Sequence, residues 1–363
     1  MPPPMSKLDA PLLLEPEFKE KIWGRHNLEP LFPAPEAAPA ASSKRDSAPR
    51  LIGEAWLTGA RSRFLTGPVA GLTLGEVFKR WPAELCGASW KGAEFPLLAK
   101  FLFTHDWLSM QVHPDDAYAA RHERSRGKTE AWYIIEAEPD AAIAVGLRAA
   151  ATRKNLAIAC REGLSRVAAN IFHPSAGEVV FLPAGTVHAI GPGLVLFEVS
   201  ETSDVTYRLD DYGRRDKQGH ARELHLDRGL ETARPELPAH RNLPRLQFPE
   251  PFGARRYALA CPFFAVELLD VRAHGHFEAA PGRVEGLAVI SGAGRVENEN
   301  GWLAYGAGQT WLVPPAAGSY RLAPEERSLL VRFYVPDLDA DFRQPLAKRG
   351  ASPHAIQTVV FDP

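Results

Sequence analysis

Short apolar segments separated by glycine and proline dominate the chain. Residues 107–114 (WLSMQVHP), 131–137 (AWYIIEA), 178–185 (EVVFLPAG), 194–199 (LVLFEV) and 206–212 (TYRLDDY) are rich in aromatic or β-branched residues between turn residues, which predicts strands. A second group of such segments comprises 263–271, 283–297, 302–305, 309–315 and 328–335. Short strands at such close intervals indicate an all-β sandwich or barrel.

Three segments carry helical signals instead. Apolar residues recur at helical spacing within Leu72–Trp81, and Thr152–Ala169 has the same periodicity, so the second segment is predicted as a helical insert. Asp115 and Asp116 are suited to cap a short helix that would end before Gly127. Helices are therefore expected as additions to a strand-rich chain.

The two strand-rich regions share a weak internal repeat. Gly177–Gly191 and Gly306–Leu322 both contain a glycine, five residues, a proline and another glycine shortly afterwards. In the second copy, Ser319 and Tyr320 stand where the first has His188. The repeat predicts two related β-domains, of which only the first can bind a metal through that position.

The predicted organisation follows from these patterns. Residues 1–250 are predicted to be a first β-domain with a helical insert at about 152–170, and the candidate metal-binding and catalytic residues considered below all lie in it. Residues 251–336 form a second, metal-free β-domain, and 337–363 a C-terminal tail. The proline-, alanine- and serine-rich stretch 29–49 is predicted to be a surface loop.

Composition and charge narrow the range of partners. The 363 residues are 45% hydrophobic with a net charge of −2, so a packed core is expected and a nucleic-acid or anionic-membrane partner is not. No apolar run reaches the length of a membrane helix, and the first residues lack the features of a secretory signal. Cys86, Cys160 and Cys261 are too few and too scattered for a disulfide framework. A cytoplasmic location is therefore expected.

Four residues in strand or loop settings form a candidate metal site. Gln111 and His113 are two positions apart in a predicted strand, so their side chains project to the same face. Glu130 opens the next strand, and His188 ends the loop after FLPAG. Two imidazoles, one carboxylate and one amide oxygen suit Zn²⁺, although Mn²⁺ and Fe²⁺ accept similar ligands. Hydrogen-bonded polar residues with no metal are the alternative interpretation.

Basic residues near these positions are candidates for binding an anion. Lys100 interrupts an apolar run, which predicts either a phosphate contact or an outward-facing side chain. Lys128 and Arg208 allow the same two interpretations, and Arg208 could simply pair with Asp204. Arg214 lies in a charged loop sequence typical of a protein surface.

Five strings of the sequence resemble a known family. FPLLAK, LSMQVHPDD, GKTEAWY, LPAGTVHAI and SDVTYRLDDY occur in this order, and the chain thereby resembles the type I phosphomannose isomerases in their short bacterial form. The resemblance runs from about Ile22 to His225. It implies a mainly β fold of two cupin (jelly-roll) barrels with a helical insert in the first.

The resemblance also implies roles for individual residues. One Zn²⁺ per chain would be held by Gln111, His113, Glu130 and His188. The family's essential arginine falls on Arg208, and Lys128 would be a second catalytic cation or a proton carrier. The implied substrate-binding residues are Lys100, Ser109, Glu198, Asp204 and Arg214.

The implied reaction interconverts mannose 6-phosphate and fructose 6-phosphate through a cis-enediol. Zn²⁺ and Arg208 would stabilise the developing negative charge, while Lys100 and Ser109 would bind the phosphate. Glu198, Asp204 and a zinc-bound hydroxide are alternative bases. Both a monomer and a homodimer are compatible with the sequence.

Three other functions are compatible with parts of this pattern. A non-catalytic sensor could retain the sugar-phosphate pocket, and an isomerase could act on another sugar or phosphosugar. A cupin oxygenase with Fe²⁺ would normally have more histidine ligands. Isomerase activity, the effect of the phosphate group and oxygen consumption distinguish these functions.

Overall fold

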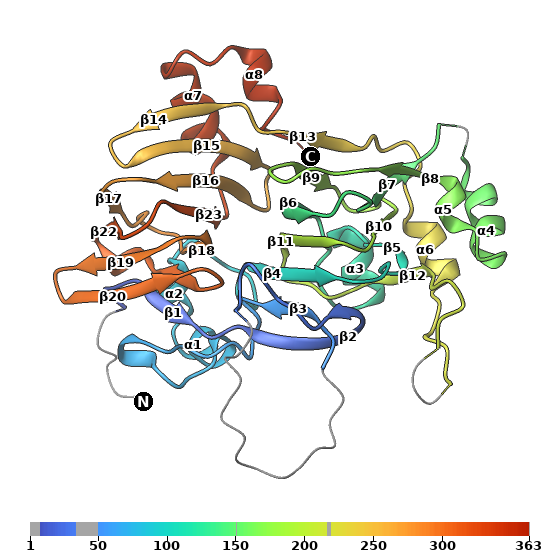
Figure 1. Cartoon of the computed structure of the whole chain (residues 1–363), viewed down its shortest axis with the longest axis horizontal. Helices are drawn as coiled ribbons and strands as arrows, with labels where there is room; N and C mark the ends of the chain where they lie inside the picture. The colour runs from blue at the N-terminus through green and yellow to red at the C-terminus, as the bar shows by residue number, and fades with distance from the viewer. Residues whose placement is uncertain (1–7, 34–49, 150, 216–218, 363) are drawn as a thin grey trace, which may run out of the picture.

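The computed structural model describes residues 8–33, 50–149, 151–215 and 219–362, so most of the surface loop predicted at 29–49 lies outside the described residues. The fold is mainly β, as the sequence predicts. Two β units lie side by side, and each consists of a larger and a smaller sheet (Figure 1). All strand pairs within these sheets are antiparallel, which is typical of cupin (jelly-roll) barrels.

The first unit contains the predicted site. Its seven-stranded sheet has the order β13-β9-β6-β11-β4-β3-β2, and its five-stranded sheet has the order β12-β5-β10-β7-β8. The strands of the larger sheet are β2 (Glu17–Arg25), β3 (Ile52–Trp56), β4 (Leu97–Thr104), β6 (Glu130–Ala137), β9 (Val179–Leu182), β11 (Leu194–Glu201) and β13 (His240–Asn242). Those of the smaller sheet are β5 (Met110–Val112), β7 (Ile143–Leu147), β8 (Ala169–Phe172), β10 (His188–Ile190) and β12 (Tyr207–Asp210).

The second unit has nearly the same plan. Its seven-stranded sheet has the order β1-β21-β18-β23-β16-β15-β14, and its four-stranded sheet has the order β17-β22-β19-β20. The larger sheet comprises β1 (Leu12–Leu14), β14 (Gln247–Glu250), β15 (Gly253–Ala260), β16 (Ala265–Val271), β18 (Glu285–Ser291), β21 (Thr310–Val313) and β23 (Ser328–Tyr334). The smaller sheet comprises β17 (Gly275–Glu278), β19 (Ala293–Asn298), β20 (Gly301–Gly306) and β22 (Ser319–Pro324).

Helices occur where the sequence carries capping signals. In α1 (Leu74–Arg80), Thr73 and Glu76 form a capping box, and Asp115 caps α3 (Asp116–His122). The predicted insert is two helices, because Gly163 has a φ of 67° between them and ends the first. The two helices of the insert are α4 (Arg153–Arg161) and α5 (Ser165–Ala168). The other helices are α2 (Pro82–Cys86), α6 (Leu226–Thr232), α7 (Gln344–Lys348) and α8 (Pro353–Gln357), with a π-helix at Leu338–Arg343 and 3-10 helices at Gly67–Val69 and Pro315–Ala317.

Alternation along the central strands assigns one face to the barrel interior and one to the contact between the units. In β11, Leu194 and Leu196 pack inside the first barrel. Phe197 points the other way and contacts Phe333 of β23, with ring centroids 5.5 Å apart. Glu198 continues the inward series of β11, so the alternation directs its carboxylate into the barrel.

The two larger sheets carry an ion pair at the same place in their register. In the first, Lys100 of β4 is directly opposite Glu198 of β11. In the second, Glu267 of β16 is opposite Arg332 of β23. The sheet orders place β16 and β23 where the first unit has β4 and β11. The two units thus share a strand plan but reverse the charges at this pair.

Three segments bear on the predicted domain boundaries, which stay a prediction. The N-terminal strand β1 pairs with β21 and so belongs to the sheet of the second unit. Strand β13 pairs with β9 of the first unit, whereas β14 pairs with β15 of the second. The segment predicted as a tail packs against the second unit, because Phe342 and Leu346 share a buried cluster with Tyr257 and Tyr334.

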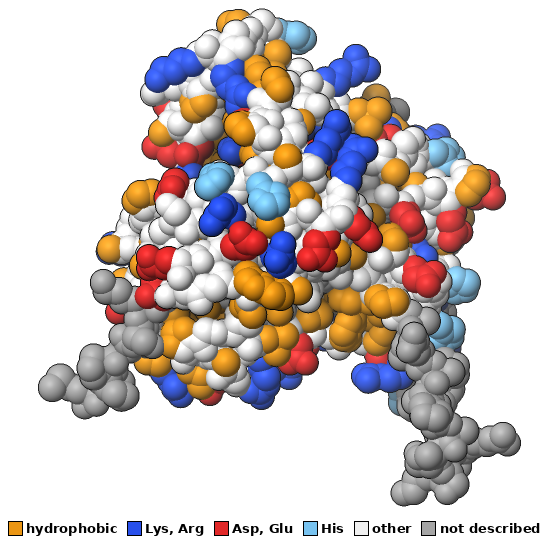
Figure 2. All heavy atoms as spheres, turned by 60° about the vertical axis from the view of Figure 1, so that its left-hand side comes forward, with side chains coloured by type: hydrophobic (Ala, Val, Ile, Leu, Met, Phe, Trp, Pro, Cys, Tyr) orange, Lys and Arg blue, Asp and Glu red, His pale blue; other side chains and the backbone are white. Residues whose placement is uncertain are grey.

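The surface view adds one observation about charge. Acidic, basic and histidine side chains are interspersed across the face shown in Figure 2. Within the described residues, no helix combines the length and the apolar character that a bilayer crossing requires.

Candidate functional site

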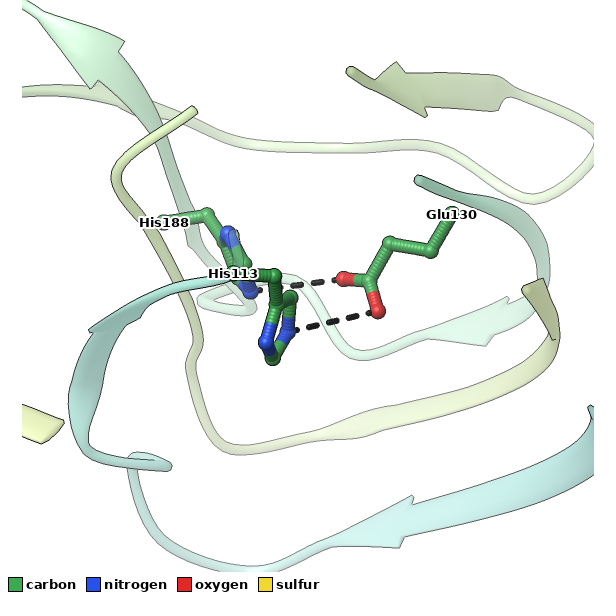
Figure 3. Close-up of side chains that lie close together, drawn as sticks. All are labelled: His113, Glu130 and His188. Carbon is green, nitrogen blue, oxygen red and sulfur yellow. Dashed lines mark ion pairs between the residues drawn. The ribbon is translucent and has the colours of Figure 1, made fainter. Parts of the chain in front are cut away.

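Three buried side chains of the first barrel converge on one point. His113 follows β5, Glu130 is the first residue of β6 and His188 is the first residue of β10. One potential ligand atom from each lies within 4.8 Å of the others, and this is the one such group found in the described parts of the chain. The two oxygens of Glu130 point toward different imidazoles (Figure 3), at 3.5 Å from His113 Nε2 and 3.3 Å from His188 Nε2.

Backbone carbonyls orient both imidazole rings. His113 Nδ1 lies 2.8 Å from the carbonyl oxygen of Val205, and His188 Nδ1 lies 2.9 Å from that of Thr186. Because a carbonyl can only accept a hydrogen bond, each Nδ1 carries the proton and each Nε2 keeps a lone pair. Outer contacts of this kind fix the tautomer of metal-binding histidines.

The electrostatics of the group suit a cation. Burial, assisted by Lys128 and His188, lowers the pKa of His113 well below its ordinary value, and burial also lowers the pKa of His188. Burial opposes ionisation of Glu130, but Lys128 and His188 outweigh it and lower its pKa. At neutral pH the group is therefore two neutral imidazoles and one carboxylate. Glu130 Oε1 is buried without a hydrogen-bond partner, as expected of an atom reserved for a ligand.

Gln111 borders this group with its amide. Its Nε2 is 3.2 Å from His188 Nε2, while its Oε1 accepts a hydrogen bond from Ser109 Oγ at 3.3 Å. Rotation of the amide by 180° about its last bond would exchange its oxygen and nitrogen. Gln111 is therefore placed to be a fourth ligand, but its nitrogen faces the group in this structure.

Lys128, Lys100 and Glu198 form a buried ionic network beside the three residues. The Nζ of Lys128 donates to Glu130 and lies 3.3 Å from Glu198 Oε1. Lys100 Nζ is also 3.3 Å from Glu198 Oε1, and it is 3.9 Å from Asp204. Burial lowers the pKa of both lysines, but the carboxylates outweigh it and raise them, so both lysines are charged.

A pocket of about 240 Å³ lies over this network. Most of the predicted substrate-binding and catalytic residues line it: Lys100, Ser109, Lys128, Glu198, Asp204 and Arg208. The predicted metal ligand Gln111 lines it as well. The other lining residues are Lys21, Trp23, Glu54, Leu102, Leu108, Thr206 and Arg222. Of the four candidate metal ligands, Gln111 lines the pocket, opposite a wall that is rich in cations.

Arg208 differs from the other cations of the pocket. It lies on β12, a strand with no counterpart in the second unit, and is opposite Gln111 in the register. Its guanidinium donates to the Glu223 carbonyl at 2.7 Å and forms no ion pair with a described residue. Its Nε is buried without a partner. This unpaired cation next to a candidate metal ligand is suited to bind negative charge.

Arg214 lies outside the lining of the pocket, although the sequence suggested a substrate contact. Its guanidinium donates to Asp211 Oδ1 at 2.5 Å, to Asp106 Oδ2 at 3.2 Å and to the carbonyl of Trp107. Each of these partners is part of the protein, so Arg214 anchors the loop after β12.

Sequence reasoning missed Lys21, Glu54 and Arg222 as pocket residues. Lys21 and Glu54 come from neighbouring strands and form an ion pair at 3.1 Å. The alternation in β2 could have placed Lys21, but the sequence of this segment gave no clear strand signal. Arg222 follows a loop, where no periodicity predicts the direction of a side chain.

A second carboxylate holds the segment that leads into Glu130. Glu201 is buried, accepts a hydrogen bond from the backbone N–H of Thr129 at 3.1 Å and pairs with Arg126 at 2.8 Å. Burial raises the pKa of Glu201 to about 7. The native state therefore retains a proton on Glu201 at pH values where the unfolded chain has lost it.

This raised pKa makes a prediction about stability. Because the native pKa of Glu201 lies above the unfolded value of 4.5, its contribution to the free energy of unfolding declines as the pH rises from about 4.5 through 7. Relative to Glu201→Gln, the wild-type protein is expected to lose about 3 kcal/mol of unfolding free energy between pH 4 and pH 8. Urea denaturation of both proteins at these pH values measures this difference. Parallel pH profiles of the two proteins would contradict the assignment.

The second barrel lacks an equivalent ligand group. Glu285 opens β18 and is opposite Val313, just as Glu130 opens β6 opposite Leu182. Strand β22 occupies the position of β10 in the second unit, and its buried side chain at the place of His188 is that of Tyr320. Glu285 accepts a hydrogen bond from the partly buried Arg332.

Comparisons with known proteins agree with this geometry. Residues 12–150 match the family described as phosphomannose isomerase type I, catalytic domain. A mannose-6-phosphate isomerase of Streptococcus mutans is 35% identical over 234 residues, which are 63% of this chain and 70% of that protein. A probable mannose-6-phosphate isomerase of Bacillus subtilis, GmuF, is 32% identical over 86% of this chain and 96% of its own length.

A solved structure extends the similarity to the fold. The crystal structure of the mannose 6-phosphate isomerase from Bacillus subtilis has a TM-score of 0.79 with 27% sequence identity. The match covers 89% of this chain and 99% of the crystallised chain, so it includes both β units.

Proposed function

Because the chain belongs to the type I phosphomannose isomerase family, we propose that it interconverts mannose 6-phosphate and fructose 6-phosphate with one bound divalent ion, Zn²⁺, through a cis-enediol. The observation that carries the proposal is the buried group of His113, Glu130 and His188, which Gln111 and Lys128 of the pocket wall contact. Two neutral imidazoles and a carboxylate form a donor set that suits Zn²⁺. Gln111 is the proposed fourth ligand.

When bound, the ion supplies Lewis acidity to the oxygens of the substrate. The chain's own residues prepare the site for it. Val205 and Thr186 fix the two imidazoles through their carbonyl groups, and Glu130 presents an oxygen that no described side chain satisfies by a hydrogen bond. The ligands are thus preorganised on strand ends.

The proton moves between C2 and C1 of the open-chain sugar, which requires a group that can accept and return it. Glu198 and Asp204 are the carboxylates of the pocket proposed for this role. Burial opposes ionisation of Glu198, but Lys128 and Lys100 lower its pKa, so it is an available acceptor at neutral pH. Lys128, hydrogen-bonded to Glu198, is the proposed second cation or proton carrier.

Arg208 is the proposed stabiliser of the enediolate. It is the register partner of Gln111, and its buried Nε has no protein partner, so it lies where charge develops next to the ligand set. A preorganised cation in a water-poor site is among the strongest electrostatic contributions to catalysis. Lys100 and Ser109 are proposed to contact substrate oxygens in the inner part of the pocket, since Ser109 Oγ donates to Gln111.

Removal and return of the metal tests this proposal. We expect purified protein to contain about one zinc per chain, to lose mannose 6-phosphate isomerase activity on thorough chelation and to regain it with stoichiometric Zn²⁺. Metal analysis coupled to the isomerase assay measures both properties on the same sample. Full activity in a verified metal-free sample would overturn the metal-dependent mechanism.

The same preparation separates the other candidate functions. A sugar-phosphate sensor would bind mannose 6-phosphate without converting it, and an oxygenase would consume oxygen. An isomerase of free sugars would not lose rate when the phosphate is absent. Each of these results would contradict the proposed reaction.

A further inference from the structure

The inner part of the pocket carries excess negative charge. Beside Lys21, which is paired with Glu54, Lys100 and Lys128 contribute two positive charges, against three carboxylates at Glu130, Glu198 and Asp204. The ion pairs between the lysines and Glu198, and between Lys128 and Glu130, neutralise both ammonium groups. This end is therefore suited to a metal cation and offers little attraction to a phosphate dianion.

The outer part of the pocket has the opposite balance. Arg208 and Arg222 both line it, and Arg208 has no carboxylate partner among the described residues. Arg222 is paired with Asp211, but this carboxylate is shared with Arg214. Arg214 is also paired with Asp106, so two carboxylates face three guanidinium groups, and the third of these, that of Arg208, is unpaired. The arginine side is suited to a group that carries close to two negative charges, as a phosphate ester does at neutral pH.

Asp211 holds Arg222 in a defined orientation. The carboxylate is buried, and its Oδ2 accepts a hydrogen bond from Arg222 Nε at 2.8 Å, while its Oδ1 accepts one from a terminal amino group of Arg222. Burial opposes ionisation of Asp211, but the bonds from Arg222 and Arg214 outweigh it and lower its pKa. The other terminal amino group of Arg222 has no hydrogen bond to a described residue and remains available to a ligand.

We propose that Arg222, oriented by Asp211, is the principal contact of the substrate's phosphate group and determines the preference for a phosphorylated sugar. This inference rests on the proposed isomerase function and adds a specificity residue to it. Arg208, next to Gln111, then lies between the reacting carbons and the phosphate. Lys100 and Ser109, which the sequence resemblance suggested as the phosphate contacts, then contact the inner end of the sugar instead.

The test measures phosphate recognition separately from turnover. Arg222→Gln is expected to raise the KM for mannose 6-phosphate, and the inhibition constant of inorganic phosphate, by the same factor of about 10 to 100. We expect kcat and zinc content to change far less. Arg222→Lys keeps the positive charge but loses the planar guanidinium that can form two parallel hydrogen bonds. It is expected to restore part of the affinity for phosphate. Arg215→Gln, an exposed charge change in the same loop, is the matched control.

The role of Asp211 is tested by a double-mutant cycle. Asp211→Asn is expected to raise the same two constants, and to have little further effect once Arg222 is glutamine, because Asp211 acts on the phosphate through Arg222. A merely structural role would instead lower kcat or the melting temperature equally in both backgrounds. That additive result would overturn the positioning role.

Two outcomes distinguish this inference from the proposed function. If the wild-type protein isomerises mannose 6-phosphate but Arg222→Gln and Arg215→Gln have equal phosphate inhibition constants, the inference is wrong and the function stands. If the wild-type protein does not isomerise this substrate, the proposed function is wrong. Calorimetric titration of both variants with inorganic phosphate still decides whether Arg222 binds the anion.

Discussion

Replacing His113 by alanine is expected to remove the bound metal and the isomerase activity together. His113 is 2% exposed and contributes one of the two Nε2 lone pairs of the candidate ligand group. Without it, Glu130, His188 and the neutral amide of Gln111 remain, which is a weaker donor set than tight zinc sites have. Loss of the Lewis acid amounts to several kcal/mol of transition-state stabilisation, so activity is expected to fall by roughly three orders of magnitude.

Zinc content by mass spectrometry and turnover of mannose 6-phosphate, measured on the same preparation, check this expectation. His105→Ala is the matched control, because His105 is exposed and lies outside the ligand group. A His113→Ala protein that retained one zinc per chain would contradict the assignment of His113 as a ligand.

Arg208→Ala is expected to lower kcat by about 100- to 1000-fold while the zinc content stays at one per chain. The buried Nε of Arg208 has no protein partner, and its position opposite Gln111 brings the guanidinium next to the ligand set without making it a ligand. Its removal takes away a cation from the transition state and leaves the metal ligands in place. Steady-state kinetics and metal analysis separate these two effects.

Arg321→Ala controls for the loss of a surface arginine, because Arg321 is exposed and lies on β22 of the second unit. Near-normal turnover in Arg208→Ala would remove the catalytic role assigned to Arg208. Loss of zinc from this variant would also contradict the proposal, since it would make Arg208 a support of the metal site.

Much of the fold was predictable because its signals are local. The capping box of Thr73 and Glu76 and the cap at Asp115 are short-range features, and both helices form where these residues indicate. The break at Gly163 depends on a single backbone conformation, so periodicity alone predicted one continuous insert. The pairing of β1 with β21 joins residues almost 300 positions apart, for which the sequence holds no local signal.

The candidate site also combines features that the local sequence predicts with features that depend on the folded chain. The spacing of Gln111 and His113 in a strand predicts a shared face, and the structure brings His113, Glu130 and His188 together. Arg214 and Arg222 lie in one charged loop region, and sequence reasoning chose Arg214. Which of the two reaches the pocket depends on how Asp211 binds both guanidinium groups, and that is a property of the folded loop.

The reversed ion pairs of the two barrels bear on which barrel requires a bound cation. Glu285 stands in the second barrel where Glu130 stands in the first, but the partly buried Arg332 compensates it from within the chain. That half therefore needs no outside ion to balance its interior. In the first half, the negative charge of the interior is not fully balanced by the chain, so this barrel requires a cation from solution. The same strand plan, repeated twice in one polypeptide, therefore requires an external cation in one copy and none in the other.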